Sequence, residues 1–256
     1  MSPRDVRTQT QERNKLNTSL LKLRLSKLAA SVTRPGCWRA LAHGVAPSIE
    51  HLPVLKNLTV DGIIDVGANR GQFSLTCRIA MPNIPVLAFE PIPSEAKIYT
   101  SIHRKIQGVE LFQYALGETF AEAEFHLSNS LDSSSLLPIG KRQRDLFPET
   151  AESGTIKVDV KTLDHFLPKM SGRSEQLLKI DVQGFELGVL KGAIKTLTTC
   201  RHVYAECSEV QLYEGQALRP AVAEFLAGFG FQESGSFNQQ YDGNELIQAD
   251  YLFSRA

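Results

Sequence analysis

Residues 62–71 read GIIDVGANRG. The first five residues of this stretch form an apolar run broken only by Asp65, which is typical of a buried strand. Gly67 and Gly71 follow with three residues between them, and such glycines let the backbone turn tightly and approach a ligand closely. The stretch therefore predicts a strand, a tight turn and the start of a helix.

The chain beyond this stretch repeats the same alternation of short apolar runs and helical stretches. We predict strands over residues 62–66, 85–89, 109–115, 123–127, 155–160, 177–182 and 202–207, and helices over 71–80, 94–105, 184–197 and 220–228. Runs 231–235 and 249–254, with a turn at Asp242-Gly243-Asn244, predict an antiparallel hairpin. Apolar strands that alternate with helices indicate an α/β fold with a mostly parallel sheet and helices on both faces.

Composition excludes several classes of protein. The 256 residues fit one α/β domain, or at most two small ones. With 42% hydrophobic and 22% charged residues, the chain is neither disordered nor fibrous. No apolar run approaches the roughly 20 residues of a membrane span. The four cysteines form no C-x-x-C pair and no secretory signal is visible, so we expect a cytoplasmic protein.

The net charge of zero hides an uneven distribution. Residues 1–39 carry nine basic and two acidic side chains, a net charge of +7 that the remainder balances with −7. An apolar stripe at helical spacing over residues 14–32 predicts an amphipathic helix. We therefore divide the chain into a basic helical arm, residues 1–58, and a globular domain, residues 59–256. The arm either packs on the body, lies on an anionic membrane surface or binds a partner.

Four of the predicted strands end in a carboxylate. These residues are Asp65, Glu90, Asp181 and Glu206. In an open parallel sheet, ligands bind beyond the carboxyl ends of the strands, where the strand order reverses. We therefore expect these acids on the rim of one binding site.

The first turn and Glu90 indicate the ligand. The helix after Gly71 offers backbone amides and a positive dipole end to an anion. Asn69 stands where the dinucleotide fingerprint G-x-G-x-x-G has its middle glycine, which argues against a pyrophosphate. Glu90 follows at the position where an acid binds ribose hydroxyls. Adenosine joined to an amino acid without pyrophosphate describes S-adenosylmethionine, with Asp65 and Asn69 at its methionine end.

Seven short motifs, in order along residues 60–235, add a family resemblance. They are IDVGANRG at 64–71, FEPIP at 89–93, ALG at 115–117, TLD at 162–164, LKIDVQGFE at 178–186, VLKG at 189–192 and LYEGQ at 212–216. Together they resemble the FkbM-type methyltransferases. The resemblance implies a Rossmann-like class I methyltransferase fold, S-adenosylmethionine bound in part by Ala115 and Leu116, and a hydroxyl acceptor, often on a sugar or a polyketide. Gln183 departs from the DVEG pattern usual in that family.

The catalytic candidates follow from the chemistry of methyl transfer. The enzyme aligns the acceptor with the methyl carbon, and a base takes the hydroxyl proton during attack. Asp181 is the first candidate, with helix capping as its alternative role. Glu186 lies in the first helical turn, where a carboxylate also gains from the dipole. Glu206 either faces the acceptor or pairs with a cation. The six histidines are dispersed, and the sequence predicts no obligatory metal.

We therefore expect an S-adenosylmethionine-dependent methyltransferase, most simply an O-methyltransferase acting on a glycan or another small molecule. A nucleotide-dependent oxidoreductase is one alternative on the same fold. The other is a catalytically degenerate cofactor-binding or scaffold protein, an interpretation to which Gln183 lends some support. A nucleic-acid substrate is not expected, because the acidic body shows no strip of interleaved basic and aromatic residues.

Overall fold

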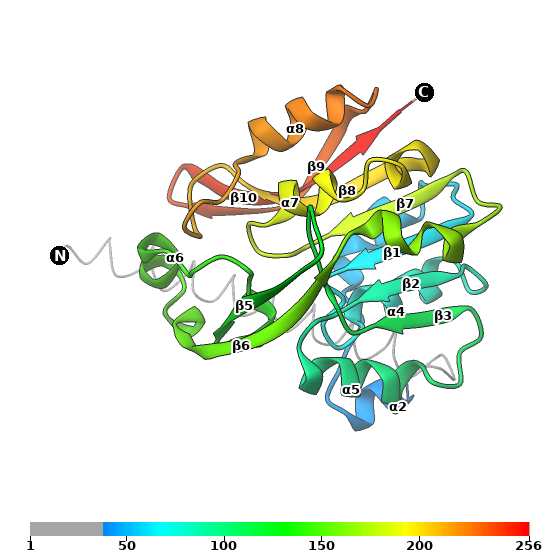
Figure 1. The fold of residues 1–256 in the computed structure, drawn as a ribbon, viewed down its shortest axis with the longest axis horizontal. Helices are drawn as coiled ribbons and strands as arrows, with labels where there is room; N and C mark the ends of the chain where they lie inside the picture. The colour runs from blue at the N-terminus through cyan, green and yellow to red at the C-terminus, as the bar shows by residue number, and fades with distance from the viewer. Residues whose placement is uncertain (1–37, 256) are drawn as a thin grey trace, which may run out of the picture.

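A seven-stranded sheet runs through the centre of the protein, in a computed structural model that describes residues 38–255 (Figure 1). The predicted helix over residues 14–32 lies outside the described residues. The strand order is β3-β2-β1-β7-β8-β10-β9. Strand bounds are β1 Gly62–Val66, β2 Val86–Phe89, β3 Val109–Phe112, β7 Gln176–Ile180, β8 Cys200–Ser208, β9 Gln232–Asp242 and β10 Glu245–Ser254. Neighbours from β3 to β8 are parallel, and β10 runs antiparallel to both β8 and β9. The predicted parallel sheet and its C-terminal hairpin are confirmed.

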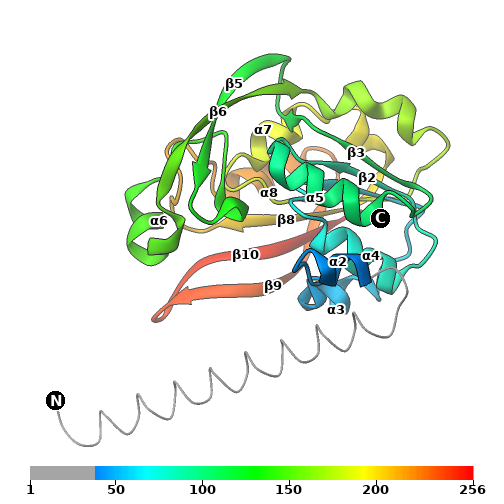
Figure 2. The same cartoon turned by 90° about the horizontal axis from the view of Figure 1, so that it is seen from below.

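Helices cover both faces of this sheet. On one face, Ile64 and Leu178 belong to the large apolar core under α7 (Glu186–Lys191), α8 (Arg219–Ala227) and the 3-10 helix η5 (Leu163–Met170). On the other, Ile63 and Leu177 pack with α3 (Leu52–Leu55) and α4 (Gln72–Ala80), beside α5 (Pro93–His103) (Figure 2). Every residue of β1 and β7 is buried, because both faces of these central strands are covered.

A second, three-stranded sheet lies beyond the carboxyl ends of β1 and β2 (Figure 1). Its order is β4-β6-β5, with bounds β4 Ala115–Leu116, β5 Ala121–Ser128 and β6 Glu152–Lys161. The prediction of one strand over residues 109–115 was therefore wrong. The chain leaves the main sheet after Phe112, and Ala115 pairs instead with Val160 of β6.

Two predicted segments differ in their helical content. The segment between β5 and β6, where the sequence predicted no helix, contains α6 (Lys141–Leu146) and the short 3-10 helices η3 (Leu131–Ser133) and η4 (Pro148–Thr150). The helix predicted over residues 184–197 is shorter, and a 3-10 turn, η6 (Thr196–Thr199), follows it. It ends at Lys191, and a Cβ atom on the next residue, Gly192, would lie 2.0 Å from the carbonyl oxygen of Gly117. The backbone that leads out of β4 passes too close for a side chain there.

The segment before β1 belongs to the body. It holds α2 (Trp38–Ala42), the 3-10 helix η2 (Ile49–His51) and α3. Ala40 packs with Leu75 of α4, and Val54 packs with Ile63 of β1. Residues 38–58 of the predicted arm therefore bury apolar side chains in the shared core, and the division into arm and domain at residue 58 stays a prediction. No helix among residues 38–255 is long and apolar enough to cross a bilayer.

Candidate cofactor and acceptor site

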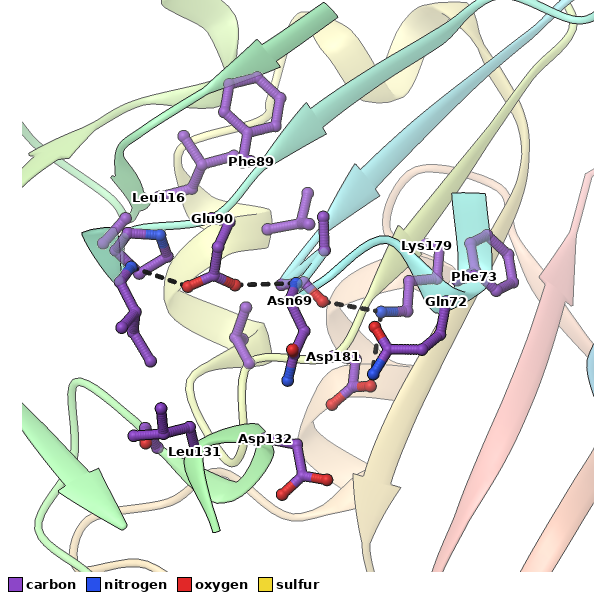
Figure 3. Close-up of a pocket in the computed structure, with 18 of the residues that line it drawn as sticks. Asn69, Gln72, Phe73, Phe89, Glu90, Leu116, Leu131, Asp132, Lys179 and Asp181 are labelled. Atoms are coloured by element: carbon purple, nitrogen blue, oxygen red, sulfur yellow. Dashed lines mark hydrogen bonds and ion pairs between the residues drawn. The ribbon is translucent and has the colours of Figure 1, made fainter. Parts of the chain in front are cut away.

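A cavity of about 360 Å³ lies at the carboxyl ends of β1, β2 and β7 (Figure 3). Its walls come from the β1–α4 turn, the residues after β2, strand β4, helix η3, the end of β7 and residues 46–51. Ligand cavities of this kind usually measure about 300–1,000 Å³. Its size and its place on the sheet are those predicted for a cofactor site in an open α/β fold.

The β1–α4 turn has its shape because two strand ends approach each other closely. Gly67 adopts a φ of +77°, and a Cβ atom on it would lie 1.8 Å from the carbonyl oxygen of Asp181. Gly71, with a φ of +92°, would place a Cβ atom 2.4 Å from Nε2 of His103. Gly67 lines the cavity, whereas Gly71 does not. Both glycines are therefore required by internal packing, whatever ligand the turn holds.

Glu90 closes one end of the cavity with a carboxylate that the backbone holds. Its Oε2 accepts a hydrogen bond from the amide of Asn69 at 2.8 Å, and Oε1 accepts one from Ile92 at 2.7 Å (Figure 3). Burial raises the pKa of Glu90 to about 7, although the two amides favour the charged form. Ala115 and Leu116 of β4 line the same cavity. Asn69, Glu90, Ala115 and Leu116 thus lie together, as predicted.

Lys179 is the central cation of the cavity, and the sequence argument missed it. It is the fourth residue of a fully buried strand, QLLKI. Its ammonium lies 3.5 Å from Oδ1 of Asp65, 3.4 Å from Oδ2 of Asp181 and 3.2 Å from the carbonyl oxygen of Gly67. Burial alone would lower its pKa, but the surrounding carboxylates, Asp181 foremost, raise it above its usual range. A lysine inside an otherwise apolar strand was the signal that could have revealed it.

Asp65 is fully buried and does not line the cavity. Its Oδ2 accepts a hydrogen bond from the Ser74 hydroxyl at 2.7 Å, and that hydroxyl lies 2.8 Å from the hydroxyl of Tyr99. Its other oxygen faces Lys179, as described above. Asp65 therefore connects β1 to α4 and α5 and holds the lysine in place. Direct contact with a cofactor stays a prediction.

Asp181 lines the cavity and is joined to Glu206 through Gln183. The Gln183 amide nitrogen donates to Oδ1 of Asp181 at 2.8 Å and to Oε2 of Glu206 at 2.6 Å. Its oxygen accepts a hydrogen bond from the Tyr213 hydroxyl at 2.9 Å. The residue that departs from the family pattern therefore uses both amide hydrogens to bridge two predicted site acids. Glu206 does not line the cavity, and burial, with Asp181 nearby, raises its pKa well above the usual range.

Glu186 lies outside the cavity and is almost completely buried. Its Oε1 accepts hydrogen bonds from the backbone amides of Gly184 at 2.9 Å and Val182 at 3.4 Å. Burial raises its pKa to about 7 against these hydrogen bonds. These contacts correspond to the alternative of a carboxylate that stabilises the helix N-terminus, and its catalytic role stays a prediction.

Gln72 and His51 also line the cavity, and neither was predicted. The Gln72 side-chain oxygen is buried without a hydrogen-bond partner among residues 38–255. Buried acceptors are normally paired, so this oxygen suits a donor on a ligand. No pattern in the sequence marked Gln72. His51 fell within the segment assigned to the arm.

A comparison with known families adds to this geometry. The model of the methyltransferase FkbM domain matches residues 65–233. The chain belongs to the FkbM methyltransferase family. The predicted resemblance is thereby confirmed, and the sheet with its C-terminal antiparallel hairpin is the predicted Rossmann-like class I methyltransferase fold. Methyltransferase activity is the function that membership gives.

Two curated relatives are similar over most of their length. The 2-O-methyltransferase NoeI of Sinorhizobium fredii is 29% identical over 192 residues, which cover 73% of this FkbM chain and 78% of the relative. The methyltransferase sdnD of Sordaria araneosa is 30% identical over 195 residues, covering 66% and 73%. Among solved structures, a magnesium protoporphyrin IX methyltransferase from Synechocystis with bound S-adenosylmethionine shares 10% identity over 81% of this chain and 76% of that one, with a TM-score of 0.44.

Proposed function

We propose that the protein is an S-adenosylmethionine-dependent O-methyltransferase whose acceptor is a hydroxyl of a sugar, a glycan or another small molecule. One observation carries this proposal. A single cavity has Glu90 at one end, the Lys179–Asp181 ion pair at the other, and the β1–α4 turn between them (Figure 3). This arrangement supports binding of a nucleoside at Glu90 and of an amino acid near Lys179.

The adenosine end fits Glu90 and the apolar wall beside it. Each carboxylate oxygen of Glu90 accepts one backbone amide and keeps a further lone pair for a ribose hydroxyl. Phe89 and Leu116 line the cavity on this side and offer apolar surface to a flat base. This end therefore supplies both the polar and the apolar contacts that adenosine requires.

The methionine end fits the charges around Lys179. Asp65, Asp181 and Lys179 together carry one excess negative charge, which suits a cofactor with one excess positive charge. The Gln72 oxygen, which has no hydrogen-bond partner in the described part of the chain, offers an acceptor to the cofactor amine, and the N-terminus of α4 offers amides to its carboxylate. When bound, S-adenosylmethionine supplies an activated methyl group on its sulfonium. The protein supplies alignment and a group that takes the acceptor proton.

The hydroxyl acceptor is supported by the relatives rather than by the cavity. NoeI carries 2-O-methyltransferase in its name. The motifs quoted above resemble a family whose acceptors are often sugars. Asp132 and Ser134 also line the cavity, and their side-chain oxygens suit a polar methyl acceptor.

Calorimetric titration with S-adenosylmethionine, S-adenosylhomocysteine and NAD tests the cofactor. We expect micromolar binding of both adenosyl compounds and none of NAD. Glu90→Gln is expected to weaken binding at least tenfold, since a charged acceptor of the ribose hydroxyls is lost. Glu122→Gln, an exposed acid on β5, is the matched control and should bind like the wild type. Folded protein that binds neither adenosyl compound would overturn the proposal.

A further inference from the structure

Four polar side chains form a chain of contacts at the wall of the cavity, beyond Lys179. Nδ1 of His51 lies 3.0 Å from the hydroxyl of Tyr204, and that hydroxyl lies 3.1 Å from Oδ2 of Asp250. The side-chain amide of Asn238 donates to the same Asp250 oxygen at 2.7 Å. Of the four, His51 lines the cavity. The group therefore joins the cavity wall to a partly buried carboxylate on the C-terminal hairpin.

The shortest hydrogen bonds of this group select one tautomer of His51. A carboxylate only accepts hydrogen bonds, so the single proton of the Tyr204 hydroxyl is directed to Asp250. The tyrosine oxygen is then left to accept, and Nδ1 of His51, at 3.0 Å, is its nearest donor. The amide nitrogen of Asn238 lies 3.3 Å from the same Nδ1, but one of its hydrogens bonds Asp250 and the other has the tyrosine oxygen, at 3.5 Å, as an acceptor. Nε2 consequently carries no proton and has no hydrogen-bond partner within the described part of the chain. His51 thus presents an unprotonated ring nitrogen on a side chain that lines the cavity.

The strand register places this group on the side away from the adenosine end. Lys179 lies opposite Asp65 of β1 on one side and opposite Tyr204 of β8 on the other. Strand β10, which carries Asp250, comes next in the sheet order, whereas β2, which leads into Glu90, lies on the opposite side of β1. A cofactor held between Glu90 and Lys179 would leave the space near His51 for the methyl acceptor.

We propose that Nε2 of His51 is the general base that takes the proton of the acceptor hydroxyl, and that Tyr204 and Asp250 are positioning residues that hold its tautomer. This inference rests on the proposed O-methyltransferase function and deepens it. Asp181 is less suited to the same role, because Lys179 and Gln183 already engage its two oxygens.

The step balances in atoms and charge. The acceptor oxygen forms a bond to the methyl carbon, the carbon–sulfur bond breaks, and its electron pair stays on sulfur. The hydroxyl proton passes to Nε2 of His51. The positive charge is therefore on the sulfonium before the transfer and on the His51 imidazolium after it. The imidazolium lies beside Tyr204 and Asp250, and solvent later removes its proton.

The charges around His51 set the expected pH dependence. Burial lowers its pKa, Asp250, Glu50 and Asp181 act to raise it, and Lys179 acts to lower it. The net direction is downward from the ordinary value of 6.5. The base form thus predominates at neutral pH, and the rate of transfer should rise with pH through a midpoint below 6.5.

Nitrogen NMR of the imidazole in the full chain, together with modification by diethyl pyrocarbonate, tests the base without an acceptor. We expect a protonated Nδ1, an unprotonated Nε2 and modification at His51. In Tyr204→Phe the tautomer preference should be lost. A protonated Nε2, or a His51 that resists modification, would overturn the proposal.

Single-turnover transfer of labelled methyl to a mixture of methyl hexopyranosides tests the same residue in the reaction. His51→Gln should lower the rate at least a hundredfold and remove the acid limb of the pH profile, with unchanged affinity for S-adenosylmethionine. His126→Gln, paired with Glu152 outside the cavity, is the control and should match the wild type. A rate in His51→Gln within threefold of wild type would sink the proposal. Failure of the proposed function would appear separately, as absent cofactor binding by the wild type.

Discussion

The two ends of the cavity hold their acids in different ways. At the β2 end, the backbone amides of Asn69 and Ile92 bind both oxygens of Glu90. At the β7–β8–β10 end, side chains do this work, since Lys179 and Gln183 hold Asp181. One end is fixed by the path of the main chain, and the other depends on side chains that separate segments bring together.

This difference predicts how each end responds to change. A carboxylate held by backbone amides keeps its donors whatever side chains are replaced around it. A carboxylate held by another side chain loses its partner with one substitution, and its neighbours are then left buried and unpaired. The β7–β8–β10 end should therefore be the more sensitive to mutation.

Lys179→Met removes the cation of the side-chain-held end and should lower the free energy of unfolding the most. It leaves Asp65, which is fully buried, without its cation. Losing one member of a buried pair costs about 3–5 kcal/mol, which urea unfolding would measure. Lys169→Met is the matched control, because the Lys169–Glu110 pair is about half exposed and contributes only about 0–1 kcal/mol.

A decrease of less than about 1 kcal/mol in the free energy of unfolding of Lys179→Met would contradict the prediction that the β7–β8–β10 end is the more sensitive to mutation. Adding Asp65→Asn to Lys179→Met should recover part of the stability, because the unpaired charge is then removed together with its partner.

Glu90→Gln tests the stability of the backbone-held end. The pKa of Glu90 is raised from 4.5 to about 7 by burial. The stability that this group contributes is therefore present below pH 4.5 and is lost as the pH rises through 7, by roughly 3 kcal/mol at most. The glutamine side chain of the variant does not titrate, so the stability of the variant relative to the wild type should increase between pH 5 and 8.

Urea unfolding at pH 5, 6, 7 and 8 measures this difference. Glu186, whose pKa is raised in the same direction, is present in both proteins and its effect cancels. Replacing the acid also removes one amide acceptor, which adds a cost that does not depend on pH. Stability curves that stay parallel over this range would contradict the prediction.

Gly67→Ala tests the contact where the two ends meet, and the contribution of this contact, taken relative to a control glycine, is expected to be the smallest of the three effects. The new Cβ atom would meet the carbonyl oxygen of Asp181 in a backbone conformation with positive φ. Gly172→Ala is the control, since Gly172 has a φ of +81° and nothing within 4 Å of a Cβ atom. The positive φ alone costs about 1–2 kcal/mol, and the clash should add about 1–3 kcal/mol at Gly67. Equal losses of thermal stability in Gly67→Ala and Gly172→Ala would show that the ends of β1 and β7 can move apart at little cost.

The features that the sequence predicted are those set by local main-chain geometry. The run over residues 62–66 became β1 with the same bounds, and the glycine turn and Glu90 meet as expected. Apolar alternation and turn residues carry this information within about ten positions. The β2 end of the cavity, with Asn69 and Glu90, could therefore be placed from the sequence, whereas Lys179 and Gln72 could not.

The contacts of His51 could not be predicted, because they join distant residues. His51 and Tyr204 are 153 positions apart, and His51 and Asn238 are 187 apart. The split between β3 and β4 was missed for a related reason: residues 115–116 find their hydrogen-bond partner in β6, some 45 positions later. Neither pairing leaves a periodic signal in one sequence.

The hydrogen-bonded group around His51 also limits how the domain can be exchanged between relatives. Residues 65–233 match the family, yet His51, Asn238 and Asp250 all lie outside that segment. A version trimmed to the family boundaries would keep the cofactor-facing turn but lose one wall of the cavity and the carboxylate behind it. Chimaeras of this chain and a relative should therefore exchange the segments before residue 65 and after residue 233 together, if acceptor specificity is to be transferred along with the fold.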